Sequence, residues 1–310
     1  MRQPGERVGA PPAVKPIDRG GWRGYFVRTK WEPLLVYRSL LFVPGSRPDR
    51  FEKAAHSGAD AVCIDLEDAV APDAKDDARA ATFKYLARPR EGAATGFRMN
   101  PMSTMVGHRD LVAFVDSGAM PAFLMVPKAS GEDEIALLDD ALAEAFGDDR
   151  PPLWPLVETP SALPRVAGVA KVVGARGGIM LGGADFAATI GAMMDWDGLY
   201  MARASIVAGA SQGGCQSMDV PYLNVKDDEG LRAETLRVRS MGFTGRACIH
   251  PAQVAIINEI FSPSEEDVSK AERIAAAYAE AGGGVALLDG KLVERPVLLA
   301  AQRTLAAKRG

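Results

Sequence analysis

The chain has 310 residues, of which 47% are hydrophobic and 25% charged, as is typical of a soluble globular protein. A formal net charge of −4 gives no support for binding to nucleic acid or an anionic membrane, and no apolar run approaches the ~20 residues that span a bilayer. The three cysteines (Cys63, Cys215 and Cys248) form no Cys-x-x-Cys pair, which argues against a disulfide framework or a thiolate zinc site. We therefore expect a cytoplasmic protein.

The first 36 residues differ in composition from the rest. Residues 1–30 carry many more Arg and Lys than Asp and Glu, with several Pro and Gly. Such a stretch indicates a disordered tail or a start codon assigned too early, and it lacks a clear amphipathic helix of the transit-peptide kind. We expect 1–36 to lie outside the folded domain.

From residue 37 onward, short apolar runs alternate with helix-like segments such as Arg50–Ser57, Asp73–Leu86 and Glu132–Phe146. Runs of this length indicate strands buried on both faces of a parallel sheet, and the alternation indicates βαβ units. Eight runs predict an α/β fold, a closed (β/α)8 TIM barrel over 37–262, and no Gly-x-Gly-x-x-Gly follows the first run. The runs are Leu40–Val43, Ala61–Leu66, Phe97–Met99, Phe123–Val126, Leu153–Val157, Ile179–Leu181, Met218–Val220 and Ala247–Ile249.

The alternation ends near Phe261. Ser264 and the acidic residues after it are typical of a capped helix start, and Gly282–Gly284 would end that helix. A strand-like run at Val285–Leu288, a turn and a last helix from about Pro296 complete the chain. We expect 263–310 to form a C-terminal helical lid or arm outside the barrel.

Polar residues follow several of the predicted strands, at the barrel end where active sites of this fold lie. Glu158 and Asp185, 27 residues apart, follow two neighbouring strands. Two carboxylates with few His or Cys nearby suit a hard cation such as Mg²⁺. The alternative is that either residue caps a helix or forms a loop salt bridge.

Arg98 could clamp a carboxylate or stabilise a developing oxyanion. Alternatively it forms an ion pair with Glu67 or Asp65, and both can hold, because such an acid would orient the arginine. Asp68 is expected to cap the following helix. Lys128 is left open between an ion pair and a substrate contact.

The turn after the first strand contains Gly45, and Arg47, Arg50 and Lys53 add positive charge around it. A turn of this kind allows the backbone to approach a ligand, and the charges suit phosphate groups. A solvated helix start would explain the same residues.

Taken together, these segments resemble the motifs of the citrate lyase β-like branch of the HpcH/HpaI aldolase superfamily, over Arg38 to about Arg303. They are RSLLFVPGSRPDRFEKA, ADAVCIDLEDAVAPDAKDDAR, FRMNP, VPK, PLVETPSAL, LGGADFAATIGA and GFTGRACIHPAQV. The branch includes malyl-CoA, β-methylmalyl-CoA and citramalyl-CoA lyases.

The resemblance implies that Glu158 and Asp185 are Mg²⁺ ligands and that Arg98 contacts substrate oxygens. The residues that it matches to coenzyme A contacts are Phe42, Arg47 and Lys53. Members resemble trimers or hexamers in which the arm closes over a neighbour's site and delivers an aspartate from a Gly-Lys-x-Val-Asp-x-Pro motif. Here Glu294 stands at that position, one methylene longer. We take Arg98, Glu67 and Glu294 as the catalytic candidates.

The implied reaction is Mg²⁺-dependent cleavage of a 3-hydroxyacyl-CoA thioester to an acyl-CoA plus glyoxylate or pyruvate, or the reverse condensation. Three alternatives remain. One is a citrate lyase β subunit acting on an acyl-carrier thioester. Another is a CoA-independent pyruvate aldolase, and the third is a non-catalytic metabolite-binding homologue.

Overall fold

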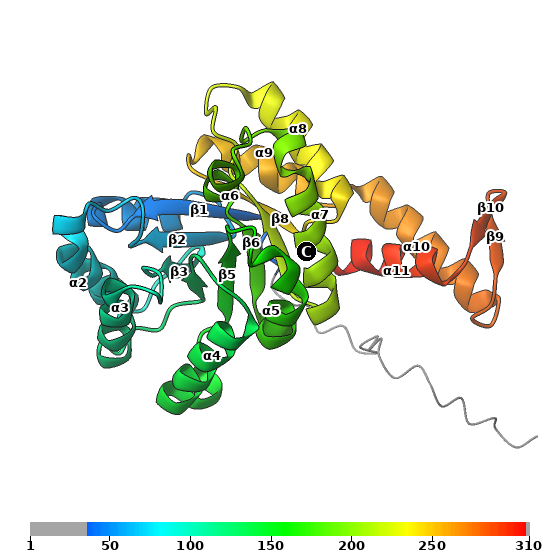
Figure 1. Ribbon diagram of the computed structural model, residues 1–310. Helices are drawn as coiled ribbons and strands as arrows, with labels where there is room; N and C mark the ends of the chain where they lie inside the picture. Colours follow the sequence, from blue (N-terminus) through cyan, green and yellow to red (C-terminus); the bar gives the residue numbers. More distant parts are fainter. Residues whose placement is uncertain (1–35, 308–310) are drawn as a thin grey trace, which may run out of the picture. The chain divides into compact units, whose positions relative to one another are not determined.

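The computed structural model describes residues 36–307, and it confirms the predicted (β/α)8 barrel (Figure 1). Eight parallel strands pair in chain order, and β1 also pairs with β8, which closes the barrel. All but the last residue of the predicted extension 1–36 lie outside the described residues. The strands are β1 (Ser39–Pro44), β2 (Ala61–Asp65), β3 (Ala94–Arg98), β4 (Leu124–Val126), β5 (Leu153–Val157), β6 (Gly178–Leu181), β7 (Gln216–Asp219) and β8 (Gly245–Cys248).

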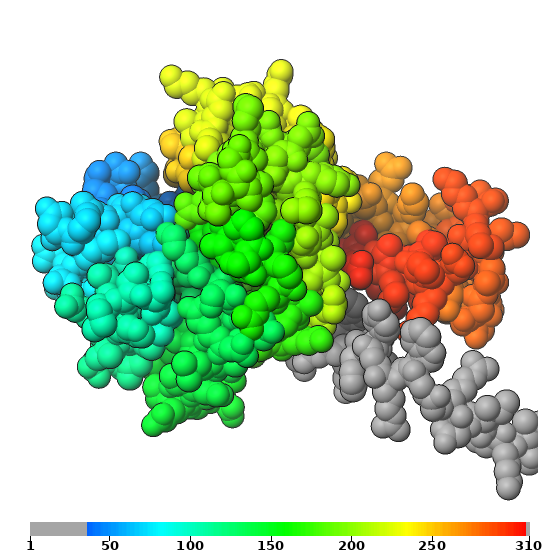
Figure 2. Space-filling model, viewed as in Figure 1, coloured from blue at the N-terminus to red at the C-terminus, as the bar shows by residue number. Residues whose placement is uncertain are grey.

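Helices connect the strands and cover the outside of the barrel. In the space-filling view, the green segments form a continuous surface over this side of the barrel (Figure 2). The predicted helix at Arg50–Ser57 is shorter than expected, because Pro48–Arg50 forms a 3₁₀ turn before α1. The helices are α1 (Phe51–Ala55), α2 (Lys75–Leu86), α3 (Met105–Asp116), α4 (Glu132–Phe146), α5 (Val166–Val173), α6 (Gly183–Ile190), α7 (Trp196–Gly213), α8 (Asp228–Met241) and α9 (Ala252–Phe261).

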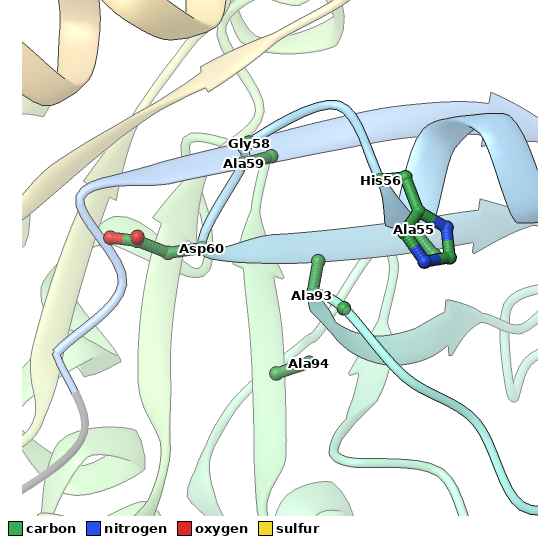
Figure 3. A pocket seen from close by; sticks show the side chains of 8 residues that line it. Ala55, His56, Gly58, Ala59, Asp60, Ala93 and Ala94 are labelled. Carbon is green, nitrogen blue, oxygen red and sulfur yellow. The ribbon is translucent and has the colours of Figure 1, made fainter.

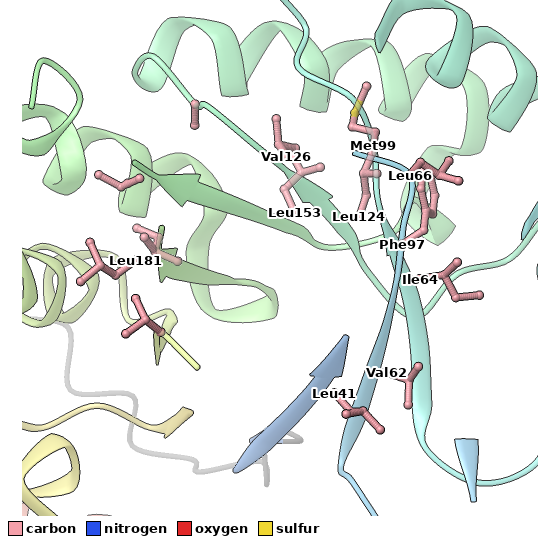
Figure 4. Packing of buried hydrophobic residues seen from close by; sticks show 14 of the residues in the cluster. Leu41, Val62, Ile64, Leu66, Phe97, Met99, Leu124, Val126, Leu153 and Leu181 are labelled. Carbon is pink, nitrogen blue, oxygen red and sulfur yellow. The ribbon is translucent and has the colours of Figure 1, made fainter. Parts of the chain in front are cut away.

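Residues of each strand alternate between two apolar cores, because successive side chains in a strand point to opposite faces. The outer core lies between strands and helices and includes Leu41, Val62 and Ile64 (Figure 4). The inner core fills the barrel with intervening residues such as Leu40 and Cys63. This double burial explains why the strands appear in the sequence as continuous apolar runs.

The part of the chain after α9 folds as α10 (Glu265–Glu280), a hairpin of β9 (Ala286–Leu288) and β10 (Lys291–Val293), and α11 (Arg295–Ala306). Ser264 caps α10 through a reciprocal capping box with Asp267, as its sequence suggests. Helices α10 and α11 pack against each other. None of the described helices is long and apolar enough to cross a membrane.

A buried network of charges joins α7, β7, α8 and β8. Arg203 and Asp219 are almost completely buried, and the Arg203 Nε lies 3.0 Å from Asp219 Oδ1. Glu234 accepts hydrogen bonds from both Arg203 and Arg246, and Arg246 also donates to Thr235 Oγ1 at 3.0 Å. Burial raises the pKa of Asp219 despite these arginines. The network therefore depends on every member having its partner.

We expect Asp219→Ala to lower the free energy of unfolding by about 3–5 kcal/mol, because it leaves buried arginine charge without its partner. The matched control is Glu259→Ala, which removes one member of an exposed ion pair with Arg232 and should cost at most about 1 kcal/mol. Urea denaturation followed by circular dichroism measures both. Equal losses in the two variants would contradict this account.

Candidate active site at the carboxyl ends of the strands

Strand alternation directs three of the polar residues into the barrel mouth. Asp65 continues the inward series of Ala61 and Cys63, and Glu158 continues that of Trp154 and Leu156. Arg98 follows Ala94 and Gly96 in the same way. Because all strands are parallel, these side chains meet at the carboxyl-terminal end of the barrel.

Asp65 anchors Arg98 with two hydrogen bonds. Arg98 Nε donates to Asp65 Oδ1 at 2.7 Å and Arg98 Nη2 donates to Asp65 Oδ2 at 2.6 Å. The same carboxylate accepts the backbone N–H groups of Glu67 and Ala69. The Arg98 guanidinium lies 3.0 Å from Glu67 Oε2 and 5.3 Å from the centre of the Phe42 ring. Arg98 is thus fixed on several sides before any ligand arrives.

Glu158 is a buried carboxyl group that is only 3% exposed. Lys128 donates its backbone N–H to Glu158 Oε1 at 2.6 Å. A Cβ at Gly182 would lie 2.7 Å from Glu158 Oε2, so only glycine leaves room for this carboxyl group. Burial raises the pKa of Glu158 to about 8; the negative charges of Glu67 and Asp185 add to that effect, and the Lys128 N–H opposes it.

Asp185 lies in the first turn of α6, where the helix dipole favours a negative charge. Its Oδ2 atom is buried and accepts no hydrogen bond within the described residues. Lys128 Nζ lies 3.4 Å from that oxygen and donates to Glu67 Oε1 at 2.7 Å. Burial also raises the pKa of Glu67, although Arg98 and Lys128 oppose the shift.

Glu158 and Asp185 fit a hard divalent cation. The protein alone does not balance the negative charge of either carboxyl group. The pKa of Glu158 is raised to about 8, and Asp185 has a buried oxygen without a hydrogen bond. Among the described residues, no group of three or more His, Cys, Asp or Glu is placed to hold a metal. Two protein ligands agree with the way Mg²⁺ is usually bound, with waters and substrate oxygens filling the remaining positions.

The residues that the sequence matched to coenzyme A contacts are at the same end of the barrel. Phe42 is half-buried in β1, and Lys53 is exposed on α1. Arg47 is 46% exposed and makes two hydrogen bonds to Asp49 in its own turn, at 2.9 and 2.7 Å. A phosphate group would have to compete with Asp49 for this guanidinium.

The expectation that Asp68 caps a helix is wrong, whereas the role expected of Glu294 stays a prediction. Asp68 does not cap a helix, because α2 begins only at Lys75, after a 3₁₀ turn, and the N-cap of α2 is Ala74. Asp68 lies instead 3.9 Å from both Arg98 and Lys128. Glu294 is exposed at the N-cap of α11 and is not among the residues that the structure brings together at the mouth.

The sequence left Lys128 open and did not single out Gly182. Lys128 combines a positive φ of 51° with contacts to three carboxyl groups, of Glu67, Glu158 and Asp185. A lysine directly after a Val-Pro pair gives no sequence signal for that backbone geometry. The repeated Gly-Gly before Ala184-Asp185 was the available signal for the close approach at Gly182.

A separate hollow of about 560 Å³ lies at the opposite end of the barrel, beside the N-terminal ends of β2 and β3 (Figure 3). Its acidic residue, Asp60, is already held by Arg38 through three hydrogen bonds. The mouth cluster is therefore the stronger candidate for chemistry. The hollow is lined by Ala55, His56, Gly58, Ala59, Asp60, Gly92, Ala93 and Ala94.

Comparison with known proteins identifies the family of the chain. The family model HpcH/HpaI aldolase/citrate lyase matches residues 38–251, and C-C_Bond_Lyase of the TIM-Barrel fold matches 203–306. A (3S)-malyl-CoA thioesterase of Cereibacter sphaeroides is 38% identical, with 87% of this chain and 94% of the relative covered. The L-malyl-CoA/beta-methylmalyl-CoA lyase of Rhodobacter capsulatus is 33% identical, with 84% and 91% covered.

Among solved structures, CitE of Mycobacterium tuberculosis in complex with magnesium, acetoacetate and coenzyme A superposes with a TM-score of 0.71. It is 31% identical, and the match covers 87% of this chain and 97% of CitE. The predicted family resemblance is thereby confirmed.

We expect Mg²⁺ to bind more tightly as the pH rises from about 6 to 8, because below pH 8 the cation must displace a proton from Glu158. Each pH unit below 8 should weaken binding by up to about tenfold. Calorimetry in two buffers of different ionisation enthalpy should show close to one proton released per cation at about pH 7. Glu158→Gln should weaken binding and remove this pH dependence, whereas pH-independent binding by the wild type would refute the expectation.

Proposed function

Because this chain belongs to the HpcH/HpaI aldolase/citrate lyase family and is a carbon–carbon lyase, we propose that it cleaves a 3-hydroxyacyl-CoA thioester that carries a carboxylate beside the hydroxyl group. Malyl-CoA, β-methylmalyl-CoA and citramalyl-CoA are the substrates to test. The products would be an acyl-CoA and glyoxylate or pyruvate, and the reaction would run in both directions. The observation that carries the proposal is the pair Glu158 and Asp185 beside an anchored Arg98 at the barrel mouth.

Glu158 and Asp185 would hold Mg²⁺, which supplies Lewis-acid stabilisation of substrate oxygens when bound. In the cleavage direction a base takes the hydroxyl proton, and the bond between the hydroxyl carbon and its neighbour on the thioester side breaks. The electron pair of that bond goes to the thioester enolate, which then takes a proton. Arg98 is already oriented by Asp65 and Glu67, so it can stabilise the developing charge without reorganising.

Phe42, Arg47 and Lys53 would contact the coenzyme A portion of the substrate. The side chains of Arg47 and Lys53 are exposed beside the turn after β1, and the ring of Phe42 lies under Arg98. This arrangement would hold the thioester next to the arginine. The contacts of Arg47 and Lys53 with the nucleotide phosphates would be remote from the reacting bond and similar in ground and transition states, so they would affect mainly KM.

The arm, residues 263–310, would act as a lid over the mouth of a neighbouring subunit in a homotrimer or hexamer. Glu294 would be its acid–base group. Its carboxyl group is exposed and makes no capping bond to α11, so it is available to another surface. Asp289, in the turn between β9 and β10, is engaged with Arg273 at 2.7 and 2.6 Å.

Thioester hydrolysis is a second candidate, since one relative at 38% identity is a (3S)-malyl-CoA thioesterase. The products distinguish the two reactions. A lyase acting on malyl-CoA gives acetyl-CoA and glyoxylate, whereas a thioesterase gives malate and free coenzyme A.

Purified protein with Mg²⁺ should convert malyl-CoA or citramalyl-CoA to an acyl-CoA and a 2-oxo acid, and EDTA should abolish the activity. Asp185→Ala should lower kcat/KM by at least about a hundredfold with the fold retained, because one of only two protein ligands is lost. Chromatography of the CoA products and circular dichroism measure the two effects. Full activity of Asp185→Ala in EDTA would refute the metal assignment.

Glu294→Gln should abolish turnover, while Glu294→Asp should retain or increase it. The intrinsic pKa of the two acids is nearly equal, so the chemistry survives the exchange, and only the carboxyl position shifts by roughly 1 Å. Steady-state kinetics on malyl-CoA and citramalyl-CoA provide the measurement, with Glu280→Gln as a control on an exposed acid of the same arm. Wild-type activity of Glu294→Gln would remove Glu294 from the mechanism.

A further inference from the structure

Lys128 occupies an unusual position at the end of β4. Leu124 and Val126 face the outer core, so the alternation of the strand would direct residue 128 outward as well. Its φ of 51° ends that alternation, and this conformation is unfavourable for a residue that carries a side chain. The strain places the backbone N–H on Glu158 and the ammonium group beside Glu67 and Asp185.

The mouth has an excess of negative charge. Within the described residues, Arg98 and Lys128 are the cations joined by ion pairs to its carboxyl groups. Those two cations face the carboxyl groups of Asp65, Glu67, Asp68, Glu158 and Asp185. Arg98 is committed to Asp65 and Glu67, whereas Lys128 is 39% exposed and reaches Asp185, one of the two proposed cation ligands.

This position gives the ammonium group two opposite effects. It competes with a cation for Asp185, because its Nζ lies 3.4 Å from the buried Oδ2. It also supplies positive charge to an anionic substrate that must enter a mouth lined with carboxylates. Charges at such a distance still interact when both side chains are partly solvated, so each effect is expected as a change in affinity that titration can measure.

We propose that Lys128 is a specificity-determining residue whose ammonium group weakens Mg²⁺ binding to the substrate-free site and strengthens binding of the carboxylate-bearing substrate. The inference rests on the proposed function, and it concerns the choice of substrate. A thioester or 2-oxo acid with a free carboxylate is favoured over a neutral analogue. The left-handed backbone conformation directs this ammonium group toward the carboxyl groups of the mouth.

The test is calorimetry with Mg²⁺ alone, and then with pyruvate at saturating Mg²⁺, on the full-length protein. Lys128→Met should bind Mg²⁺ about tenfold more tightly and pyruvate at least about tenfold more weakly, because one charge acts on two ligands of opposite sign. Lys128→Arg should restore pyruvate binding toward that of the wild type. Lys171→Met removes an exposed positive charge from α5 and should change neither affinity.

Lys128→Gly keeps the backbone N–H and accepts the positive φ, so it separates the charge from the backbone. It should behave like Lys128→Met in both titrations, and it remains a test if the Met variant does not fold. Weaker binding of both Mg²⁺ and pyruvate, or an unchanged affinity for either, would overturn the proposal. If the wild type cleaves neither malyl-CoA nor citramalyl-CoA, the proposed function fails, whereas opposite shifts in the two titrations would still support the role of Lys128.

Discussion

The buried carboxyl group of Glu158 sets the conditions for everything around it. It is held where water cannot solvate its charge, so its pKa rises to about 8, and the adjacent carboxyl of Asp185 adds to the negative charge. A glycine at 182 and a left-handed residue at 128 are both needed to accommodate it. Such an arrangement is unfavourable for the protein alone and would become favourable if, as we propose, a divalent cation were shared between the two acids.

The positions of these groups follow from the alternation of side chains in the strands. That alternation fills the barrel with apolar residues up to the last turn of each strand and then presents Asp65, Arg98 and Glu158 at one end. Because the apolar runs and the polar residues that follow them are visible in the sequence, the barrel, its eight strands and the convergence of these residues could be predicted from it. The capped start of α10 was equally visible, because Ser264 and the acids after it act locally.

Two features differ from the sequence-based expectation for different reasons. Asp68 was expected to cap a helix, yet a local signal, the proline at 72, starts a 3₁₀ turn, and α2 begins only at Lys75. The left-handed backbone of Lys128 has no local cause in its neighbours, since it is stabilised by acids that follow β2 and β5 and by one in α6. A conformation of this kind arises from tertiary contacts, which propensity and periodicity do not describe.

The cluster itself argues for a proton acceptor from elsewhere. Asp65 accepts four hydrogen bonds, from Arg98 and from two backbone N–H groups. Glu67 is held between Arg98 and Lys128, and Glu158 and Asp185 are the pair suited to a cation. Each of these four carboxyl groups thus has an orienting task or a proposed binding task, and a base that moves a proton needs freedom to approach and leave. An exposed acid on a separate segment, as Glu294 is on the arm, meets that requirement, and the mouth would then be complete only when a second copy of the chain supplies it.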